Sequence, residues 1–456
     1  MSKENLSRGL KNRHIQMIAL GGAIGTGFFL ASSSAIQMTG PSITLAYLFG
    51  GLIMYIIMRA LGEMTVDYPT SGSYIEYAYR YIGNSAGFIA GWNGWILFTM
   101  ACMLEVTATG ALLDYWIHIP HWITCLVLLS VFGSVNLIGV KYFGETEFWF
   151  AGIKIAVIMF MIVAGTWLIL TNKIVHTTAL HNIQQYSDMQ VFFMHGFSGF
   201  VYSLVIVCLS FCGAEFVSVA AGEAKNPKKI IPTAINGVII RIILFYVLTM
   251  AVIVLMYPAK DISDKTNPFT DVLFKLGFTA SAGIINLVAI TAALSSLNSC
   301  IYVAARMLYR LSLNKQAPKY FSKVSDTHSP KNAIFFTILI AFIAVIMNYT
   351  VPQQILVYLF AIITVATIIG WYIILVTHMF FRKKKAKEGV TLEYRAPFYP
   401  YTNIFVMLVL LGILIAMAYN EDMCLSVYVA PIWLIVLFLG YKISIRQENK
   451  LKLKTK

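Results

Sequence analysis

A glycine-rich run interrupts the first hydrophobic segment of the chain and could bind a ligand through backbone atoms. Four of the seven residues from Gly21 to Gly27 are glycine, and glycine costs about 1 kcal/mol relative to alanine inside a helix. In a membrane, a broken helix is tolerated only where it is buried in protein or lines a cavity. Free N–H groups at Gly25, Thr26 and Gly27 would suit a carboxylate, because a helix N-terminus carries partial positive charge.

A second interruption falls in the middle of another apolar run, where Gly213 is followed by Glu215. Unwinding here would free the carbonyls of Phe211 and Gly213, which, with that of Ala23, suit an ammonium. A molecule with a carboxylate and an ammonium on one carbon would satisfy both interruptions. The alternative is close helix packing at small residues, which would be the better explanation of Gly21 and Gly25 alone. The two interruptions together favour a binding site formed by Ala23, Ile24, Gly25, Thr26, Gly27, Phe211, Cys212, Gly213 and Ala214.

Three ionisable residues inside apolar segments are candidates for proton coupling, because such residues are usually functional. Lys154 could gain and lose a proton; the alternative is that its ammonium snorkels to the nearby membrane surface. Glu105 is deeper in its segment and could carry a proton or lie beside the ligand, or it could pair structurally with Arg241. Glu215 could hold the second break open or titrate.

Hydroxyl groups in the eighth apolar segment raise the question of a sodium site. Ser295 and Ser296 could ligate Na⁺ together with carbonyls of the first segment. Serine in a spanning helix more often bonds to its own backbone, which is the simpler interpretation. Phe211, at the second break, could close over a ligand, although aromatic side chains more often fill a core.

The composition is that of an integral membrane protein. Of 456 residues, 59% are hydrophobic and 12% are charged, whereas soluble domains average about 25% charged residues. Segments of about 20 apolar residues can span a bilayer as helices. Twelve are predicted, at roughly 15–35, 42–64, 86–113, 122–140, 147–170, 191–220, 232–256, 279–310, 333–349, 353–381, 402–419 and 425–444.

The net charge of +14 follows the membrane topology and does not indicate nucleic acid binding. Lys and Arg are concentrated in alternate loops and in both terminal regions, and the opposite loops carry only Lys173, Lys260, Lys265 and Lys275. Because basic residues mark cytoplasmic loops, both termini are predicted to be cytoplasmic. Contact of the basic runs with anionic lipid is a secondary possibility.

Other features exclude several classes of protein. The six cysteines lie in or beside apolar segments without metal-ligand spacing, so no metal site is predicted. No nucleophile–base set indicates an enzyme. The stretch 67–83 mixes aromatic and polar residues, and it is predicted to form an interfacial helix or a re-entrant segment.

The two interruptions indicate an internal repeat. They lie in the first and sixth segments, which enter the membrane in opposite directions. Paired broken helices at equivalent places in two halves point to a transport site between inverted repeats. The repeats are predicted at about 15–170 and 191–381, with two added helices at about 402–444, all in one transmembrane domain spanning 1–456.

With these residues in place, the chain resembles the amino acid transporter family of the amino acid–polyamine–organocation superfamily. The resemblance covers nearly the whole chain. Its marks, in order, are Gly21–Phe28, Arg59–Met64 with Pro69–Ser73, Phe211–Glu215, Gly222–Pro232, and Leu294–Ser299 leading to Arg306–Tyr309.

The resemblance implies an all-α fold of about twelve helices with a five-plus-five inverted repeat and discontinuous helices 1 and 6. It also implies uptake of an α-amino acid, usually with protons, at a bacterial inner membrane. Lys154 matches a lysine that replaces the sodium of sodium-coupled relatives, and Glu105 matches a common acidic position. Leu209 and Cys212 depart from frequent family residues, so the side chain carried stays open.

The predicted function is therefore import of a neutral α-amino acid by proton symport, driven by the proton motive force, without a cofactor and with Na⁺ less favoured. The general pattern is similar to that of proline-type permeases. An amino acid exchanger and a membrane sensor that binds amino acids without transporting them are the alternatives. The sequence predicts no oligomeric state.

Overall fold

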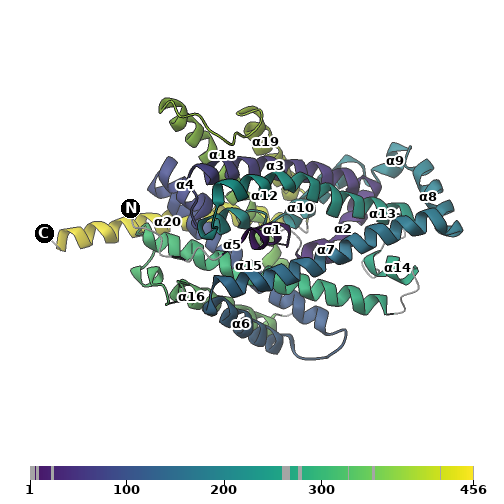
Figure 1. The fold of residues 1–456 in the computed structure, drawn as a ribbon, viewed down its shortest axis with the longest axis horizontal. Helices are drawn as coiled ribbons and strands as arrows, with labels where there is room; N and C mark the ends of the chain where they lie inside the picture. The colour runs from purple at the N-terminus through teal and green to yellow at the C-terminus, as the bar shows by residue number, and fades with distance from the viewer. Residues whose placement is uncertain are drawn as a thin grey trace.

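The protein is built from long helices that run side by side. The computed structural model describes residues 6, 10–21, 25–258, 268–275, 280–326, 328–351, 355–421 and 423–454. Among these residues the only β-type pairing is a single bridge between Leu10 and Ala224. Helix α4 and the C-terminal part of α20 lie at one end of the molecule, and α8, α9 and α14 lie at the other (Figure 1).

The first predicted half begins with a broken helix. Its helices are α1 (Asn12–Gly21), α2 (Thr26–Thr39), η1 (Gly40–Ser42), α3 (Ile43–Asp67), α4 (Ser73–Tyr81), α5 (Asn84–Leu113), α6 (His121–Ile138) and α7 (Val140–Thr171). Helices α8 (Lys173–Gln185) and α9 (Met189–Phe192) connect it to the second half.

The second half again begins with a broken helix. Its helices are α10 (Gly196–Ser210), α11 (Phe216–Ala220), η2 (Ala221–Glu223), α12 (Pro227–Ile242), η3 (Ile243–Val247), α13 (Leu248–Met256), α14 (Pro268–Lys275), α15 (Ser281–Leu313), η5 (Lys319–Ser322), α16 (Lys331–Ala341), α17 (Ile343–Thr350) and α18 (Ile355–Lys387). The last two helices are α19 (Tyr401–Ala418) and α20 (Cys424–Lys454).

Eleven stretches of the described chain are long and apolar enough to cross a membrane. Each of the twelve predicted segments contains helix, and the difference of one arises because the first segment is split between α1 and α2. The predicted class, an all-α membrane protein of about twelve helices with discontinuous helices 1 and 6, is confirmed. The boundaries of the repeats stay a prediction.

Two predicted elements differ in detail. The stretch 67–83 contains α4, whose first six residues are buried against α5 and α18, so this helix packs into the protein, and its depth in the membrane stays a prediction. The fifth span begins at Val140 instead of 147, because the charged residues at its start still form helix. Lys154 is therefore 14 residues, or about 21 Å along the helix, from its beginning.

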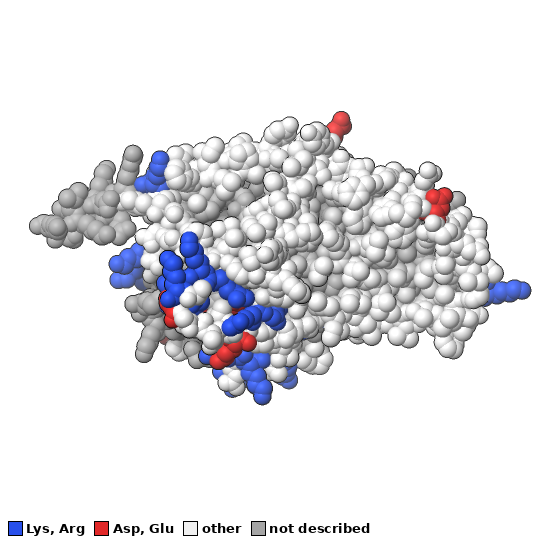
Figure 2. Space-filling view, turned by 90° about the horizontal axis from the view of Figure 1, so that it is seen from above, with Lys and Arg blue, Asp and Glu red and all other residues white. Residues whose placement is uncertain are grey.

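The surface fits a bilayer. Trp149 and Trp167 on α7 are exposed by 68% and 64%, and they lie about 27 Å apart along that helix. This distance is close to the roughly 30 Å thickness of a hydrocarbon core, and tryptophan favours the two membrane interfaces. Lys and Arg gather at one end of the face in Figure 2, which we call the basic end, and the broad middle of that face is uncharged.

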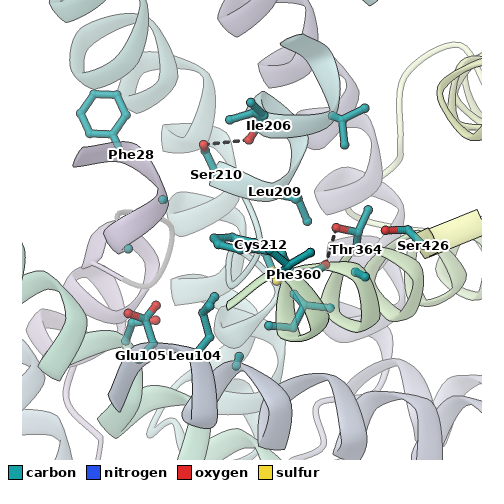
Figure 3. A pocket seen from close by; sticks show the side chains of 18 of the residues that line it. Phe28, Leu104, Glu105, Ile206, Leu209, Ser210, Cys212, Phe360, Thr364 and Ser426 are labelled. Atoms are coloured by element: carbon teal, nitrogen blue, oxygen red, sulfur yellow. Dashed lines mark hydrogen bonds between the residues drawn. The ribbon is translucent and has the colours of Figure 1, made fainter. Parts of the chain in front are cut away.

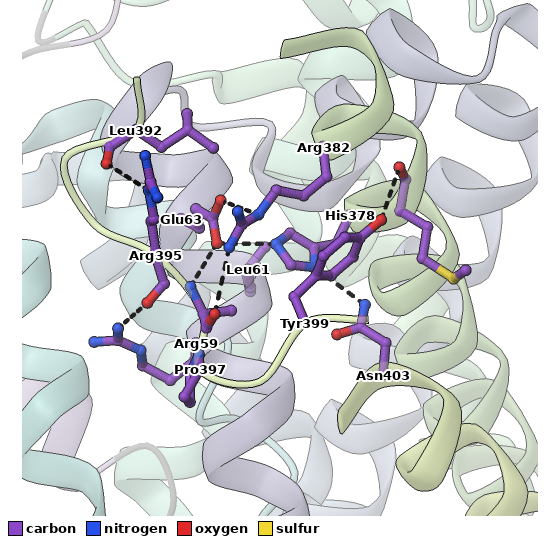
Figure 4. A network of polar contacts seen from close by, with 12 residues as sticks. Arg59, Leu61, Glu63, His378, Arg382, Leu392, Arg395, Pro397, Tyr399 and Asn403 are labelled. Atoms are coloured by element: carbon purple, nitrogen blue, oxygen red, sulfur yellow. Dashed lines mark hydrogen bonds and ion pairs between the residues drawn. The ribbon is translucent and has the colours of Figure 1, made fainter. Parts of the chain in front are cut away.

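A buried polar network joins helices at the basic end (Figure 4). Glu63 on α3 pairs with Arg382 of α18 at 2.6 Å and lies 3.1 Å from Nε2 of His378. Its Oε2 also accepts a hydrogen bond from the Ala396 N–H at 2.6 Å. Asn403 on α19 donates to Nδ1 of the same histidine at 3.0 Å. One carboxylate thus ties α3 to α18 and to the connection that follows it.

The same connection is fastened to α12. Arg59 of α3 lies over the Tyr394 ring at 3.9 Å and donates to Asn236 at 2.8 Å and to the carbonyl of Arg395. Burial raises the pKa of Tyr394 to about 12, so its hydroxyl stays protonated and donates to Asn236 at 2.8 Å. The α18–α19 connection is therefore bonded to α3 through Arg59 and to α12 through Asn236.

We predict that Glu63→Ala destabilises the protein strongly. Removing the carboxylate leaves the His378 ring and the Ala396 N–H buried without their acceptor, and breaking a buried pair typically costs about 3–5 kcal/mol. The check is the thermal unfolding midpoint in detergent. Glu388→Ala, at an exposed position, is the control and should leave the midpoint unchanged. Equal midpoints for the two variants would contradict this role of Glu63.

Candidate functional site

The first break exposes the start of a half-helix. Helix α1 ends at Gly21 and α2 begins at Thr26, with Gly25 as an extended N-cap that lacks any side-chain capping bond. The first N–H groups of a helix have no partner within the helix, so those of α2 are open to an anion. Ala23 and Ile24 lie outside the described residues.

The second break lies between α10 and α11. Gly213 has φ +102°, a conformation that side chains rarely adopt. Its N–H donates to Oε2 of Glu215 at 3.2 Å, so this carboxylate holds the turn. The carbonyls of Phe211 and Gly213 each accept one backbone bond, from Ala214 and Phe216. Each carbonyl has a second lone pair that could accept from a ligand.

A cavity of about 330 Å³ lies between the two breaks (Figure 3). Its walls come from the two broken helices and from α5, α15, α18, α19 and α20. The lining residues are Gly25, Gly27, Phe28, Ser34, Phe98, Ala101, Leu104, Glu105, Val205, Ile206, Leu209, Ser210, Cys212, Phe216, Ser296, Cys300, Val357, Phe360, Ala361, Ile363, Thr364, Met417, Met423, Leu425 and Ser426.

The cavity is largely apolar and carries one carboxylate. Glu105 projects from α5, across from Cys212 and Leu209 of the second break (Figure 3). A Cβ added to Gly25 would lie 3.4 Å from Oε1 of Glu105 and 3.7 Å from Oγ of Ser296. A Cβ on Gly27 would meet nothing within 4 Å, because that position faces open space. The first break therefore meets Glu105 and Ser296 at one edge of the cavity.

Lys154 is held inside the protein. Its side chain is fully buried, and Nζ donates to Oγ of Ser295 on α15 at 2.9 Å. This geometry excludes snorkelling to the surface in this conformation. The same serine donates to Oε1 of Glu147 at 2.7 Å. Lys154 is also within electrostatic reach of Glu105. It is not among the residues that line the cavity, but its partner Ser295 is the neighbour of Ser296, which does line it.

Glu147 is a site residue that the sequence analysis missed. It precedes Lys154 by seven residues, which places both on one face of α7. That spacing, together with a carboxylate at the start of an apolar segment, is a signal that could have identified it. The serine that joins the two residues comes from a distant helix and could not be paired with them from the sequence.

Two predicted contacts are not formed. Arg241 donates to Gln16 of α1 at 2.8 Å, so the hypothesis that it pairs with Glu105 has no support here. Phe211 is buried among Tyr47 and Tyr246, with ring centroids 6.2 and 4.9 Å away. Its ring does not line the cavity in this conformation and would have to leave this cluster to cover a ligand. Thr26 contributes the first residue of α2.

The described residues hold no cluster of three or more His, Cys, Asp or Glu that could bind a metal ion. All six cysteines are free thiols. Cys212 lies at the second break, 3.7 Å from the hydroxyl of Thr367 on α18. It therefore behaves as a wall residue of the cavity that contacts α18.

A multi-pass helical protein with a small-molecule cavity between two broken helices is a membrane transporter by class. Residues 14–454 match the amino acid permease family, and the chain belongs to it. It is a permease and not an enzyme.

Curated relatives agree with this assignment. The aromatic amino acid transport protein AroP of Escherichia coli (strain K12) is 42% identical over 439 residues, which cover 96% of this chain and 95% of that protein. The AroP protein of Salmonella typhi is 40% identical with the same coverage. The probable threonine/serine transporter YbxG of Bacillus subtilis (strain 168) is 40% identical over 444 residues, 97% of this chain and 96% of that protein.

We predict that Gly27→Val weakens amino acid binding by at least about tenfold, equivalent to 1.4 kcal/mol. The added side chain would project into the space through which a ligand approaches the N–H groups of α2. Affinity is measured with a labelled amino acid on purified protein. Gly412→Val, at an exposed glycine with nothing within 4 Å of its added Cβ, is the matched control. Normal affinity in Gly27→Val would argue against the backbone carboxylate site.

Proposed function

We propose that the protein imports an uncharged α-amino acid with a bulky side chain, together with protons, by alternating access. The observation that carries this proposal is the position of the cavity. It lies between the N-terminus of α2 and the carbonyls of the second break, with Glu105 at its edge. Lys154 is bonded to Ser295, the neighbour of the lining residue Ser296. Backbone recognition of both charged groups fits any α-amino acid and leaves selectivity to the cavity walls.

In the proposed complex, the substrate carboxylate binds the open N–H groups at Gly25, Thr26 and Gly27. The ammonium binds the carbonyls of Phe211 and Gly213, each of which has a free lone pair. The helix macrodipoles support both contacts, because N-termini favour anions and C-termini favour cations. The second contact lies at the C-terminus of α10, whose partial negative charge adds to that of the carbonyls.

The walls beyond these anchors favour an uncharged side chain. Leu104, Leu209 and Phe360 line the space, and Glu105 is the only Asp, Glu, Lys or Arg among the described lining residues. A charged side chain placed against the apolar walls would be desolvated, which is costly, and Glu105 lies at the first break, beside the proposed carboxylate site. The volume of 330 Å³ lies within the range of about 300–1,000 Å³ for small-molecule sites and favours a large residue. The relative named for aromatic amino acids fits this better than the one named for threonine and serine.

Coupling to protons is supported by Lys154. Its ammonium donates to the Ser295 hydroxyl, which a sodium site would need as a ligand. The positive charge of the ammonium would repel a Na⁺ at that place. Na⁺ is therefore disfavoured, and Lys154 with Glu105 is proposed to carry the coupling proton. Glu215 is assigned to holding the second break, because its carboxylate accepts from Gly213.

The cavity is proposed to face outward in this conformation. Val357, at the start of α18, lines the cavity, whereas the last turn of the same helix carries Lys384, Lys385 and Lys387. The cavity therefore extends away from the basic end, which the positive-inside rule assigns to the cytoplasm. Both termini would then be cytoplasmic in a bacterial inner membrane, and the helices of the two breaks would rock to open the other side.

We expect uptake into proteoliposomes without internal substrate when the outside is more acidic than the inside, and loss of that uptake when a protonophore is added. Lys154→Ala should lower the driven uptake by about tenfold or more while binding is largely retained. Uptake that ignores the gradient and needs internal substrate would identify an exchanger. Binding without any flux would identify a sensor.

We expect large uncharged amino acids to compete best in a panel of all common amino acids against one labelled substrate. Phenylalanine, tyrosine, tryptophan and leucine should displace the label, and aspartate, glutamate, lysine and arginine should not, because the apolar walls would desolvate their charges and Glu105 lies at the first break beside the substrate carboxylate. Serine and threonine should compete weakly. Strong competition by charged residues, or a clear preference for serine and threonine, would contradict the proposed selectivity.

A further inference from the structure

Glu147 is a carboxylate buried completely in a membrane protein, and the proposed cycle does not use it. It lies at the level of Trp149, which marks the membrane interface nearer the basic end, yet none of its surface is exposed. Burying a charge costs free energy unless it is paired and hydrogen-bonded. The contacts of Glu147 must therefore compensate for the cost of burying its carboxylate.

Those contacts form a short chain. Lys154 Nζ donates to Ser295 Oγ at 2.9 Å, and Ser295 Oγ donates to Glu147 Oε1 at 2.7 Å. Both distances lie in the normal range of hydrogen bonds. The serine has one proton and gives it to the carboxylate, so its lone pairs are free to accept from the lysine. In both hydrogen bonds, the donor is thus on the side of the ammonium and the acceptor is on the side of the carboxylate.

The other charged groups near Glu147 are engaged elsewhere. On α1, which packs along α7, Arg13 and His14 pair with Glu145. On α15, Arg306 and the Tyr302 hydroxyl bond to Glu223, and the Tyr302 ring stacks on Phe143 with centroids 4.0 Å apart.

A second hydroxyl, that of Ser299 on α15, is also close enough to Glu147 to donate to it. Among the described residues, three further neighbours of α7 bring no charged donor to Glu147. Helix α13 (Leu248–Met256) has no Asp, Glu, His, Lys or Arg. The ionisable groups of α6, His121 and Cys125, lie near its start, at the far end from the α6–α7 turn at Gly139. The His and Lys residues of α8 follow the opposite end of α7. Lys154 is therefore the charged proton donor to which Glu147 is connected.

We propose that Glu147 is the proton acceptor of Lys154 and the first station of proton release toward the basic end. This inference rests on the proposed proton symport. In the step, one Nζ–H bond of the ammonium breaks as that proton binds Ser295 Oγ, and the serine's own proton moves to Glu147 Oε1. A neutral amine and a neutral carboxylic acid replace the ion pair, and the serine is regenerated. No further reactant is needed.

The direction of the step follows from the position of its ends. Ser296 lines the cavity, and its neighbour Ser295 faces α7. Glu147 is seven residues, or about 10 Å along α7, closer to the basic end than Lys154. A proton taken up near the cavity would thus advance from the substrate side toward the interface marked by Trp149. Rocking of the helices would then expose the protonated carboxyl to water.

The test separates proton coupling from substrate movement in proteoliposomes. Glu147→Gln keeps an acceptor for Ser295 but cannot take a proton. It should lower accumulation driven by a pH gradient by at least about tenfold, while counterflow of labelled against unlabelled amino acid, which needs no net proton release, stays within about twofold of the wild type. Glu147→Asp should restore part of the driven accumulation, and exposed Glu388→Gln should behave as the wild type.

Ser295→Ala is the second variant, because it removes the bridge and leaves both ionisable groups in place. It should reproduce the loss of driven accumulation with counterflow retained. Driven accumulation at the wild-type level in Glu147→Gln would overturn the relay and leave the proposed function intact. Loss of counterflow in both variants would make the cluster structural and overturn the relay. Wild-type protein that ignores the pH gradient would overturn proton symport and the relay with it.

Discussion

The need to shield unsatisfied backbone groups from hydrocarbon determines the rest of the structure. Two helices are broken, at Gly21–Gly25 and at Ser210–Phe216, and such breaks are tolerated only within protein or along a cavity. Helices α5 and α15 accordingly lie deep in the fold. In each, 72% of the most apolar 18-residue stretch is buried, whereas the value for α20 is 11%. The breaks need this enclosure, and the enclosure in turn creates a cavity that both breaks border.

Charge is distributed unevenly along the same helices. Buried ion pairs near the basic end join α3 to α18 through Glu63, η2 to α15 through Glu223 and Arg306, and α4 to α15 through Glu76 and Arg310. The cavity extends toward the opposite end. Since breaking a buried pair by removing one partner is costly, these links would hold the basic end closed in the proposed outward-facing state. Opening that end would require the pairs to be exchanged for others or hydrated, so the two proposed conformations would differ in electrostatic contacts as well as in packing.

Local sequence signals predicted most of the fold, including both helix breaks, but not the contacts between distant helices around them. Apolar length located the spans, and glycine with its missing side chain located both breaks. Such local signals could not identify which residues of distant helices contact one another. Ser295 is 148 residues from Glu147, and only packing of α15 on α7 brings them together. The direction of the Phe211 ring depends on rotation at the turn around Gly213, and Arg241 finds Gln16 instead of Glu105 for the same reason: helix rotation about its axis is set by tertiary contacts.

The residues proposed to bind the ligand and those proposed to couple proton movement are adjacent but separate in this structure. Successive helical residues point about 100° apart, so Ser296 faces the cavity while Ser295 binds Lys154. The Gly25 position approaches Glu105 and Ser296 within about one contact distance, which makes the first break the meeting point of the two functions. A ligand that reorders this break would shift α2 against α15, and with it the pair of serines. A ligand can bias an equilibrium only through contacts that differ between the two states, and in the proposed complex those contacts are backbone contacts common to all α-amino acids. Under this proposal, the walls could change in evolution to select another side chain without altering how binding is coupled to Lys154.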